Sequence, residues 1–173
     1  MTTSIRNQFL MILSIISLIA CGFQLRGGIE ANFDSISIDG GSAGFVKQLK
    51  KRLKQSSIAV LPTGGQVKLQ IVDDLLDKRI LSLNSDGRIS EYELNYKVSY
   101  RIKGQNDSEW GQLINNEVRR QYTYDDENVV AKALEEEKLI NGMRDELIRT
   151  ITAQISAWPC RSPTSMCLPR CRR

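Results

Sequence analysis

Apolar and polar residues alternate with a period of two along much of the chain, and this pattern predicts β-strands. The first alternating stretch is 35–39, and a shorter apolar run at 58–61 fits a short strand or the entry to a turn. A longer stretch begins at 67–76 and runs on toward Leu83. The clearest strand covers 92–102, where six alternate positions on one face are apolar: Tyr92, Leu94, Tyr96, Val98, Tyr100 and Ile102.

Turn signals connect these strands in the order of a meander. Asn84-Ser85-Asp86-Gly87 is a tight turn of the Asp-Gly kind, which favours a hairpin. A second turn at 104–107 leads into a returning strand over 110–124, with Ile114, Val118, Tyr122 and Tyr124 on one face.

Two segments show the three- and four-residue spacing of an amphipathic helix. Ser42 is a candidate N-cap for a helix over 43–55. A final helix over 127–157, capped by Asp125 or Asp126, has the expected apolar seam Val130, Leu134, Ile140, Met143, Leu147, Ile151 and Ile155. The order of elements predicts an α/β (α+β) two-layer sandwich: a mixed, mostly antiparallel sheet of about four strands with two helices packed on one face.

The aromatic residues of the two central strands fit two interpretations. They form either the core beneath the helices or an amphipathic aromatic surface. If they are core, the opposite face of the sheet is free to meet water or a partner. On the expected register that face carries Glu91, Glu93, Asn95, Lys97, Arg101, Asn116 and Arg120.

The N-terminus has the pattern of a secretory signal peptide. Twelve residues, 9–20, are apolar except for two serines, and Arg6 precedes them. As a helix this run reaches about 18 Å, which is too short to cross a hydrocarbon core of roughly 30 Å. A basic start, a short apolar stretch and small residues before a cut site are typical of a cleaved signal peptide over 1–20.

Leu18-Ile19-Ala20-Cys21 matches the lipobox of bacterial lipoprotein precursors. Cleavage before Cys21 would leave it as a lipidated first residue, and two or more acyl chains give stable membrane anchoring. Residue 22, the second residue of the mature chain, is glycine rather than aspartate. The resemblance to bacterial lipoproteins then implies export to the outer membrane rather than retention in the inner one. We therefore expect one domain over 21–157, anchored through a covalent N-acyl diacylglyceryl group on Cys21.

The last residues, 158–173, differ in composition from the rest and are expected to be disordered. They contain three prolines, no acidic residue and the cysteines Cys160, Cys167 and Cys171. With Cys21 lipidated, an odd number of cysteines remains, so one bridge with one free thiol is possible and the pairing stays open. Their spacing matches no standard zinc pattern.

Composition argues against catalysis. The 173 residues include no histidine, which excludes Ser-His-Asp and Cys-His catalytic pairs and histidine-ligated metals. The carboxylate pairs at 73–74 and 125–126 could be the acid and nucleophile of a glycosidase. The first pair is better explained as strand neighbours that face opposite ways, and the second as a helix cap. We expect no enzyme activity, no metal site and no cofactor.

The positive net charge says little about function, because it comes from the two ends of the chain and not from the expected domain. The formal net charge is +4, from 24 basic and 20 acidic residues. Without Arg6 and the four arginines after residue 158, residues 22–157 hold 19 basic and 20 acidic groups. The lysine-rich run at 47–54 fits a solvated helix face or a phosphate-binding surface. Because the signal peptide directs the protein away from most nucleic acid, nucleic acid is not an expected partner.

Three stretches resemble the lipopolysaccharide-assembly lipoprotein family LptE, also called RlpB. The mature start Cys21-Gly22-Phe23-Gln24-Leu25-Arg26 is similar to the family's Cys-Gly-aromatic-x-Leu-Arg opening. Asp86-Gly87 followed by Ser90-Glu91-Tyr92 resembles its central hairpin, and Ala131-Lys132 resembles the opening of its last helix. The resemblance covers about 21–157.

The resemblance implies a non-enzymatic plug inside an LptD-like outer-membrane β-barrel, which helps the barrel assemble and transport lipopolysaccharide. It also implies lipopolysaccharide binding through two basic positions. One matches Lys132; the other matches Ser85, so this sequence departs there, and Arg88 could supply the charge instead. The alternative is a generic outer-membrane lipoprotein that serves as a periplasmic structural or peptidoglycan-associated adaptor.

Overall fold

The computed structural model describes residues 31–158. Cys21, the signal segment and the cysteines after residue 159 therefore lie outside the described residues. Five strands, one 3-10 helix (η1) and two α-helices follow in the order β1 (Ser35–Asp39), α2 (Ala43–Gln55), β2 (Ala59–Leu61), β3 (Val67–Leu83), β4 (Ile89–Gly104), β5 (Ile114–Thr123), η1 (Asp126–Asn128) and α3 (Val129–Ser156).

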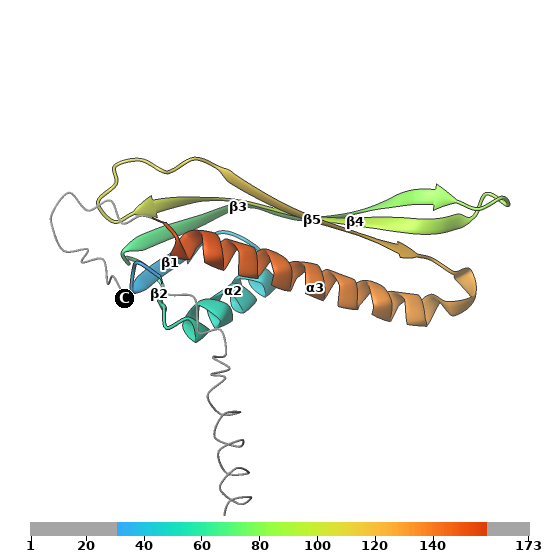
Figure 1. Ribbon diagram of the computed structural model, residues 1–173, viewed down its shortest axis with the longest axis horizontal. Coiled ribbons are helices and arrows are strands. Elements are labelled where there is room, and N and C mark those ends of the chain that lie inside the picture. The colour runs from blue at the N-terminus through green and yellow to red at the C-terminus, as the bar shows by residue number, and fades with distance from the viewer. Residues whose placement is uncertain (1–30, 159–173) are drawn as a thin grey trace, which may run out of the picture.

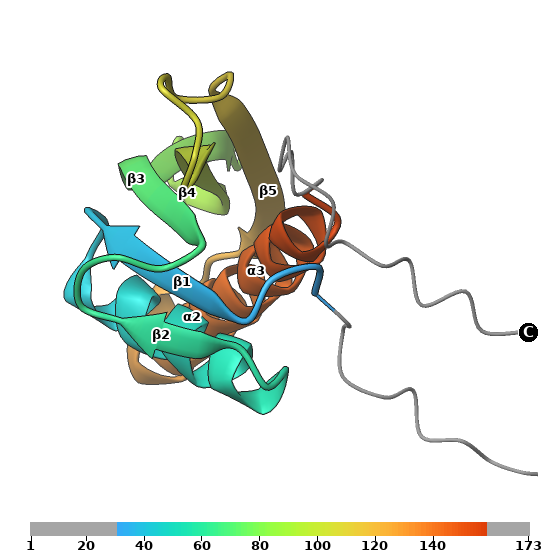
Figure 2. The same cartoon turned by 90° about the vertical axis from the view of Figure 1, so that its left-hand side faces the viewer.

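The strands form one mixed sheet in the order β2-β1-β3-β4-β5. β1 pairs in parallel with β2 and with β3, whereas β3, β4 and β5 form an antiparallel meander. Both helices lie on the same side of this meander (Figure 1), and the sheet curves around them when viewed from the end (Figure 2). The predicted α+β sandwich is confirmed, with five strands rather than about four, because 59–61 pairs with β1.

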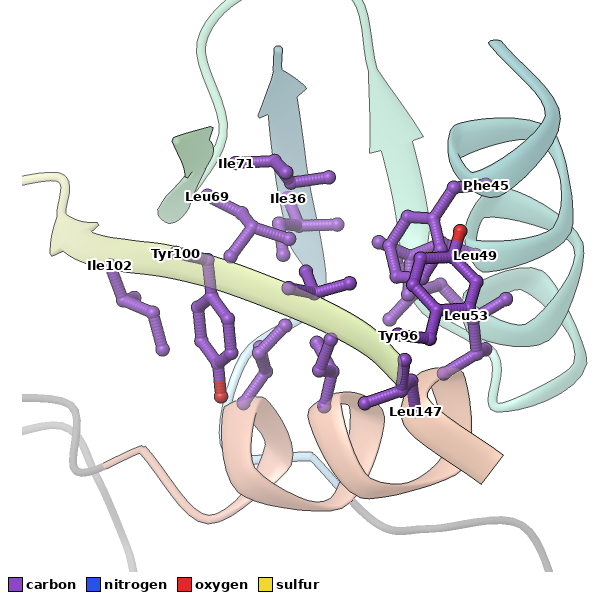
Figure 3. Close-up of a cluster of buried hydrophobic side chains, with 14 of the residues drawn as sticks. Ile36, Phe45, Leu49, Leu53, Leu69, Ile71, Tyr96, Tyr100, Ile102 and Leu147 are labelled. Atoms are coloured by element: carbon purple, nitrogen blue, oxygen red, sulfur yellow. The ribbon is translucent and has the colours of Figure 1, made fainter. Parts of the chain in front are cut away.

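The hydrophobic core lies between the sheet and the two helices. Phe45, Leu49 and Leu53 of α2 are fully buried, as is Tyr100 of β4. They meet Leu147 of α3 and the β3 side chains in one cluster (Figure 3). The Ser42 hydroxyl accepts a hydrogen bond from the Phe45 amide, so the predicted N-cap of this helix is confirmed. The alternating face of 92–102 is core, which settles the role of Tyr96 and Tyr100.

Strand β3 contains a β-bulge that reverses which residues face the helices. Ile71 pairs with Tyr100, but Asp73 pairs with the next residue along β4, Ser99, so Val72 is the extra residue. Beyond the bulge the helix-facing residues are therefore Asp74, Leu76, Lys78 and Ile80, opposite Val98, Tyr96, Leu94 and Tyr92. Without it, Asp73 and Asp77 would point toward α3.

The predicted seam of the last helix is wrong in its first two turns. Met143, Leu147, Ile151 and Ile155 are buried as expected. Val130 and Leu134, however, are 77% and 56% exposed. The reason is that α2 is 13 residues long and α3 is 28 residues long, so α2 reaches only part of α3 (Figure 1).

The returning strand begins later than expected, although Ile114, Val118 and Tyr122 share the helix-facing side as predicted. It starts at Ile114, because the Gly111 amide donates to the Ile102 carbonyl and 110–113 remains a loop. Asn116 and Arg120 pair with Val98 and Leu94 and so face the helices, not the open side as predicted. The helix at 127–157 is an α-helix only from Val129, after one turn of 3-10 helix.

Candidate functional site

The molecule is elongated, and its two ends differ. The described chain starts and finishes at one end, while the turn at 84–87 and the start of α3 lie at the other (Figure 1). We call the turn at 84–87, Arg88 and residues 125–136 the distal end. It contains both basic residues that the sequence singled out as ligand-binding candidates, Arg88 and Lys132.

The hairpin turn is fixed by its own polar groups. The Asn84 side-chain oxygen accepts hydrogen bonds from the Asp86 amide at 3.0 Å and the Arg88 amide at 2.9 Å. Gly87 has a φ of 75°, a conformation that favours glycine. Arg88 and Ser85 are both exposed, and within residues 31–158 the Arg88 side chain has no ion-pair partner.

Lys132 lies at the positive end of the α3 dipole and is already paired. Its ammonium group contacts the Glu135 carboxylate at 2.9 Å. Asp125, just before η1, accepts from the Asn128 side chain and the Glu127 amide, and these two bonds lower the pKa of its carboxyl. The distal end therefore holds charges of both signs, and an anion that binds Lys132 has to compete with Glu135.

A polar cluster, not an apolar seam, fastens the start of α3 to the sheet. Lys78 of β3 contacts the Glu136 carboxylate at 2.7 Å, and the Tyr122 hydroxyl donates to the same carboxylate oxygen at 2.6 Å. The Lys78 ammonium also lies 4.1 Å from the centre of the Tyr92 ring. We call these four residues the Lys78–Glu136 clamp. It joins β3, β4 and β5 to one helix residue, Glu136, which lies one turn after Lys132.

Three residues of the clamp, Glu136, Lys78 and Tyr122, have shifted pKa values. Burial acts to raise the pKa of Glu136, but hydrogen bonds from Lys78 and Tyr122 and the charge of Lys78 outweigh it, so the pKa is lowered. Burial acts to lower the pKa of Lys78, yet Glu136 and Tyr122 raise it overall. Burial and the nearby carboxylate raise the pKa of Tyr122. The clamp is thus charged and hydrogen-bonded at neutral pH.

The open face of the sheet, opposite the helices, is polar along β4 and β5, and Leu75 of β3 is exposed on it. Arg79 and Glu93 form an ion pair at 2.7 Å across β3 and β4, and Glu93 is only 5% exposed. Arg119 and Glu117 pair at 2.7 Å on β5, and this bond, followed by contact with Asn95, lowers the pKa of Glu117. No helix of the described chain covers this face, which we call the open face.

Neither a metal site nor a membrane-spanning helix is found between residues 31 and 158. No three His, Cys, Asp or Glu side chains in this range are placed to hold a metal ion together. None of the helices described has the length and apolar character needed to span a membrane.

Comparison with models of known protein families identifies one family. The family model described as "LptE: Lipopolysaccharide-assembly" matches residues 33–155, which is well over half of the chain. The chain belongs to the LptE family. The resemblance noted in the sequence is thereby confirmed, and a role in lipopolysaccharide assembly follows from it.

Solved structures support the same assignment. Lipoprotein B from Nitrosomonas europaea is 30% identical, with a TM-score of 0.69, over 79% of this chain and 91% of that one. Rare lipoprotein B from Shewanella oneidensis is 25% identical, with a TM-score of 0.63, over 71% and 94%. A minor lipoprotein from Acinetobacter baumannii, 21% identical with a TM-score of 0.60 over 72% and 92%, shares the fold. A comparison with curated proteins finds no match.

Membership also gives the broad character of this LptE chain. Its family and structural neighbours indicate a membrane-associated lipoprotein. The LptE family is non-enzymatic, which is consistent with the expectation that the protein is not an enzyme.

The sequence indicated Arg88 and Lys132 but not the clamp that lies one helix turn from Lys132. Tyr122 stood on an expected apolar face, and Glu136 was one of several acids in an early helix turn. Lys78 could not be placed, because the bulge at Val72 decides which face it occupies. A strand that continues through Asp73-Asp74 with no clear alternation is the one available signal of such a bulge.

Proposed function

We propose that this protein is the plug and assembly partner of an LptD-like outer-membrane β-barrel, and that its distal end binds lipopolysaccharide. The match of residues 33–155 to the LptE family carries the proposal. On this proposal the signal segment is cleaved and Cys21 is lipidated, so that the domain is anchored to the outer membrane and lies within the barrel lumen.

The open face of the sheet suits a plug. The lumen of a large outer-membrane barrel is polar, and an element inside it needs hydrogen-bonding and charged side chains on its surface. The open face presents alternating charges at fixed positions, including Arg119, Glu117 and Arg79. Such a surface can exchange water for polar groups of a barrel wall without burying an unpaired charge.

The distal end suits an anionic lipid. Lipopolysaccharide carries phosphates and sugar acids, which bind lysine and arginine through charge-assisted hydrogen bonds. Arg88 is exposed and unpaired within the described residues, while Lys132 lies one helix turn from the clamp and is paired with Glu135. The absence of a basic residue at Ser85 leaves Arg88 as the basic contribution of the turn.

Ligand binding is tested with reversed charges. Arg88→Asp combined with Lys132→Asp should weaken binding of purified lipopolysaccharide at least tenfold, without changing the circular-dichroism spectrum. Glu135→Gln is the matched variant in the opposite direction, because it frees Lys132 and should strengthen binding. Unchanged affinity in both variants would remove these residues from the site.

The partner is tested in the cell envelope. Affinity purification of the lipidated protein should recover an LptD-like barrel, and depletion should reduce lipopolysaccharide at the cell surface. If no barrel is recovered, and lipopolysaccharide export stays normal after the protein is depleted, the plug role is wrong. The role of a periplasmic structural or peptidoglycan-associated adaptor is then favoured.

A further inference from the structure

Strand β3 has a free edge along most of its length. β1 pairs only with its first four residues, Val67–Gln70. From Val72 to Leu83, β4 is its only strand partner among residues 31–158. Along this segment, which we call the β3 edge, the backbone N–H and C=O groups that point away from β4 have no partner strand in the described chain. A row of such groups can pair with another strand.

The β3 edge also exposes an unusual amount of apolar side chain. Six of the eleven large apolar side chains that are exposed in residues 31–158 belong to it: Val72, Leu75, Leu76, Ile80, Leu81 and Leu83. The opposite edge of the sheet, β5, exposes none of them between Ile114 and Thr123. Polar residues protect the β5 edge, whereas the β3 edge offers both backbone groups and apolar contact area.

The charges of the β3 edge have a definite pattern. Lys78 and Arg79 are already neutralised by Glu136 and Glu93. Asp73 and Asp77 are exposed and have no ion-pair partner in the described chain. Both pair with residues of the open face, Ser99 and Asn95, and Leu75 lies between them on that face. An incoming strand therefore meets carboxylate, leucine, carboxylate at alternate positions.

We propose that the β3 edge binds an extended segment of a partner protein by strand addition. The segment carries basic side chains opposite Asp73 and Asp77 with an apolar side chain between them, and apolar side chains opposite Leu76 and Ile80. Backbone hydrogen bonds supply affinity, and the alternate side chains supply specificity. The proposal goes beyond the plug and lipopolysaccharide roles, since none of these residues belongs to the open-face ion pairs or to the distal end.

A second copy of the chain fits the edge less well. An antiparallel pairing with Leu75 opposite Leu75 sets Asp73 of each copy against Asp77 of the other. A pairing centred on Lys78 sets two ammonium groups opposite each other. Like charges in directly opposed positions destabilise a strand pair, so a basic segment is favoured over self-association.

The experiment uses a blocked nine-residue peptide as the probe. It has lysines four positions apart, a valine midway between them, and valine and threonine alternating on its other face. The full-length protein in detergent is mixed with the peptide and followed by hydrogen exchange. At a peptide concentration ten times Kd, the free-edge amides in 72–82 should exchange about tenfold more slowly. A peptide with alternate N-methyl amides should give no protection.

Charge reversal tests the specificity. Asp73→Lys with Asp77→Lys should raise Kd for the lysine peptide about tenfold and make a glutamate version of the peptide bind better than the lysine one. Glu109→Lys with Asp145→Lys is the matched control. It makes the same change in net charge at exposed residues away from the edge, and should leave the preference unchanged.

Three results would overturn the proposal. One is equal binding by the N-methylated peptide, which would mean that no backbone pairing takes place. Another is protection at β5 instead of 72–82. The third is concentration-dependent dimerisation, seen by analytical ultracentrifugation, that protects 72–82 without peptide, which would make a second copy the occupant.

Discussion

Replacing Glu136 with alanine should loosen the start of α3 while leaving the rest of the fold intact. Glu136 is the one helix residue that Lys78 and Tyr122 both contact, at 2.7 and 2.6 Å. The apolar residues that precede it in the helix, Val130 and Leu134, are exposed and contribute little packing, and the apolar packing begins after it, at Leu139. The clamp is therefore the main attachment of this part of α3 to the sheet.

The size of the effect follows from the ion pair and the hydrogen bond that the substitution removes. Hydrogen bonds to a charged group contribute about 1.5–3 kcal/mol each when buried. The side chains of Lys78 and Glu136 are 36% and 25% exposed, so solvent screens both interactions: the ion pair then contributes about 0–1 kcal/mol and the Tyr122 hydrogen bond about 1 kcal/mol. Removing both interactions should cost about 1–2 kcal/mol, which corresponds to roughly a tenfold change in a local opening equilibrium.

Hydrogen exchange measured by mass spectrometry or NMR is the appropriate assay, because it reports local opening separately from global unfolding. In Glu136→Ala, the amides of 132–138 should exchange about tenfold faster, while those around Ile151 stay unchanged. Glu137→Ala is the control, since this neighbouring acid is exposed and has no ion-pair partner in the described chain. Equal exchange in the two variants would show that the clamp does not hold the helix.

Three further outcomes follow from the core, one turn and the clamp. Phe45→Ala should lower the free energy of unfolding by about 3–5 kcal/mol in urea titration, because Phe45 is fully buried. Gly40→Ala should cost at least about 1 kcal/mol in the same titration, because Gly40 has a φ of +78° and a Cβ there would lie 2.3 Å from the Ile71 carbonyl oxygen. The lowered pKa of Glu136 means that its stabilising contribution is complete above the unfolded value of 4.5 and is lost as the pH falls through the lower folded value. Exchange of 132–138, corrected for the intrinsic rate, should therefore rise on acidification below about pH 4.5, and much less so in Glu136→Gln.

The local spacing of apolar and polar residues was enough to predict most of the fold. The period of two over 92–102 placed Tyr96 and Tyr100 in the core, and Ser42 marked the start of α2. These features depend on neighbours within a few residues, and sequence spacing records such neighbours directly.

Features that depend on distant parts of the chain were not predictable in the same way. Asn116 and Arg120 alternate with the apolar residues of the same strand, so their predicted place on the open face broke the period of two. They face α3, where their partners Gln154 and Glu146 are far away in the sequence. The exposure of Val130 depends on the length of α2, which is far away in the sequence. Lys78 faces the helix only because Val72 forms a bulge.

The two halves of the protein are held together by different kinds of interaction, and this difference bears on function. Around Phe45 and Leu147 two helices cover the sheet, and burial of apolar side chains dominates. Toward the distal end one helix remains, and the Lys78–Glu136 clamp replaces apolar packing. Regions with few buried apolar side chains open most easily. An anionic ligand that draws Lys132 away from Glu135 acts on the part of the helix that is least costly to move, while the hydrophobic half stays rigid.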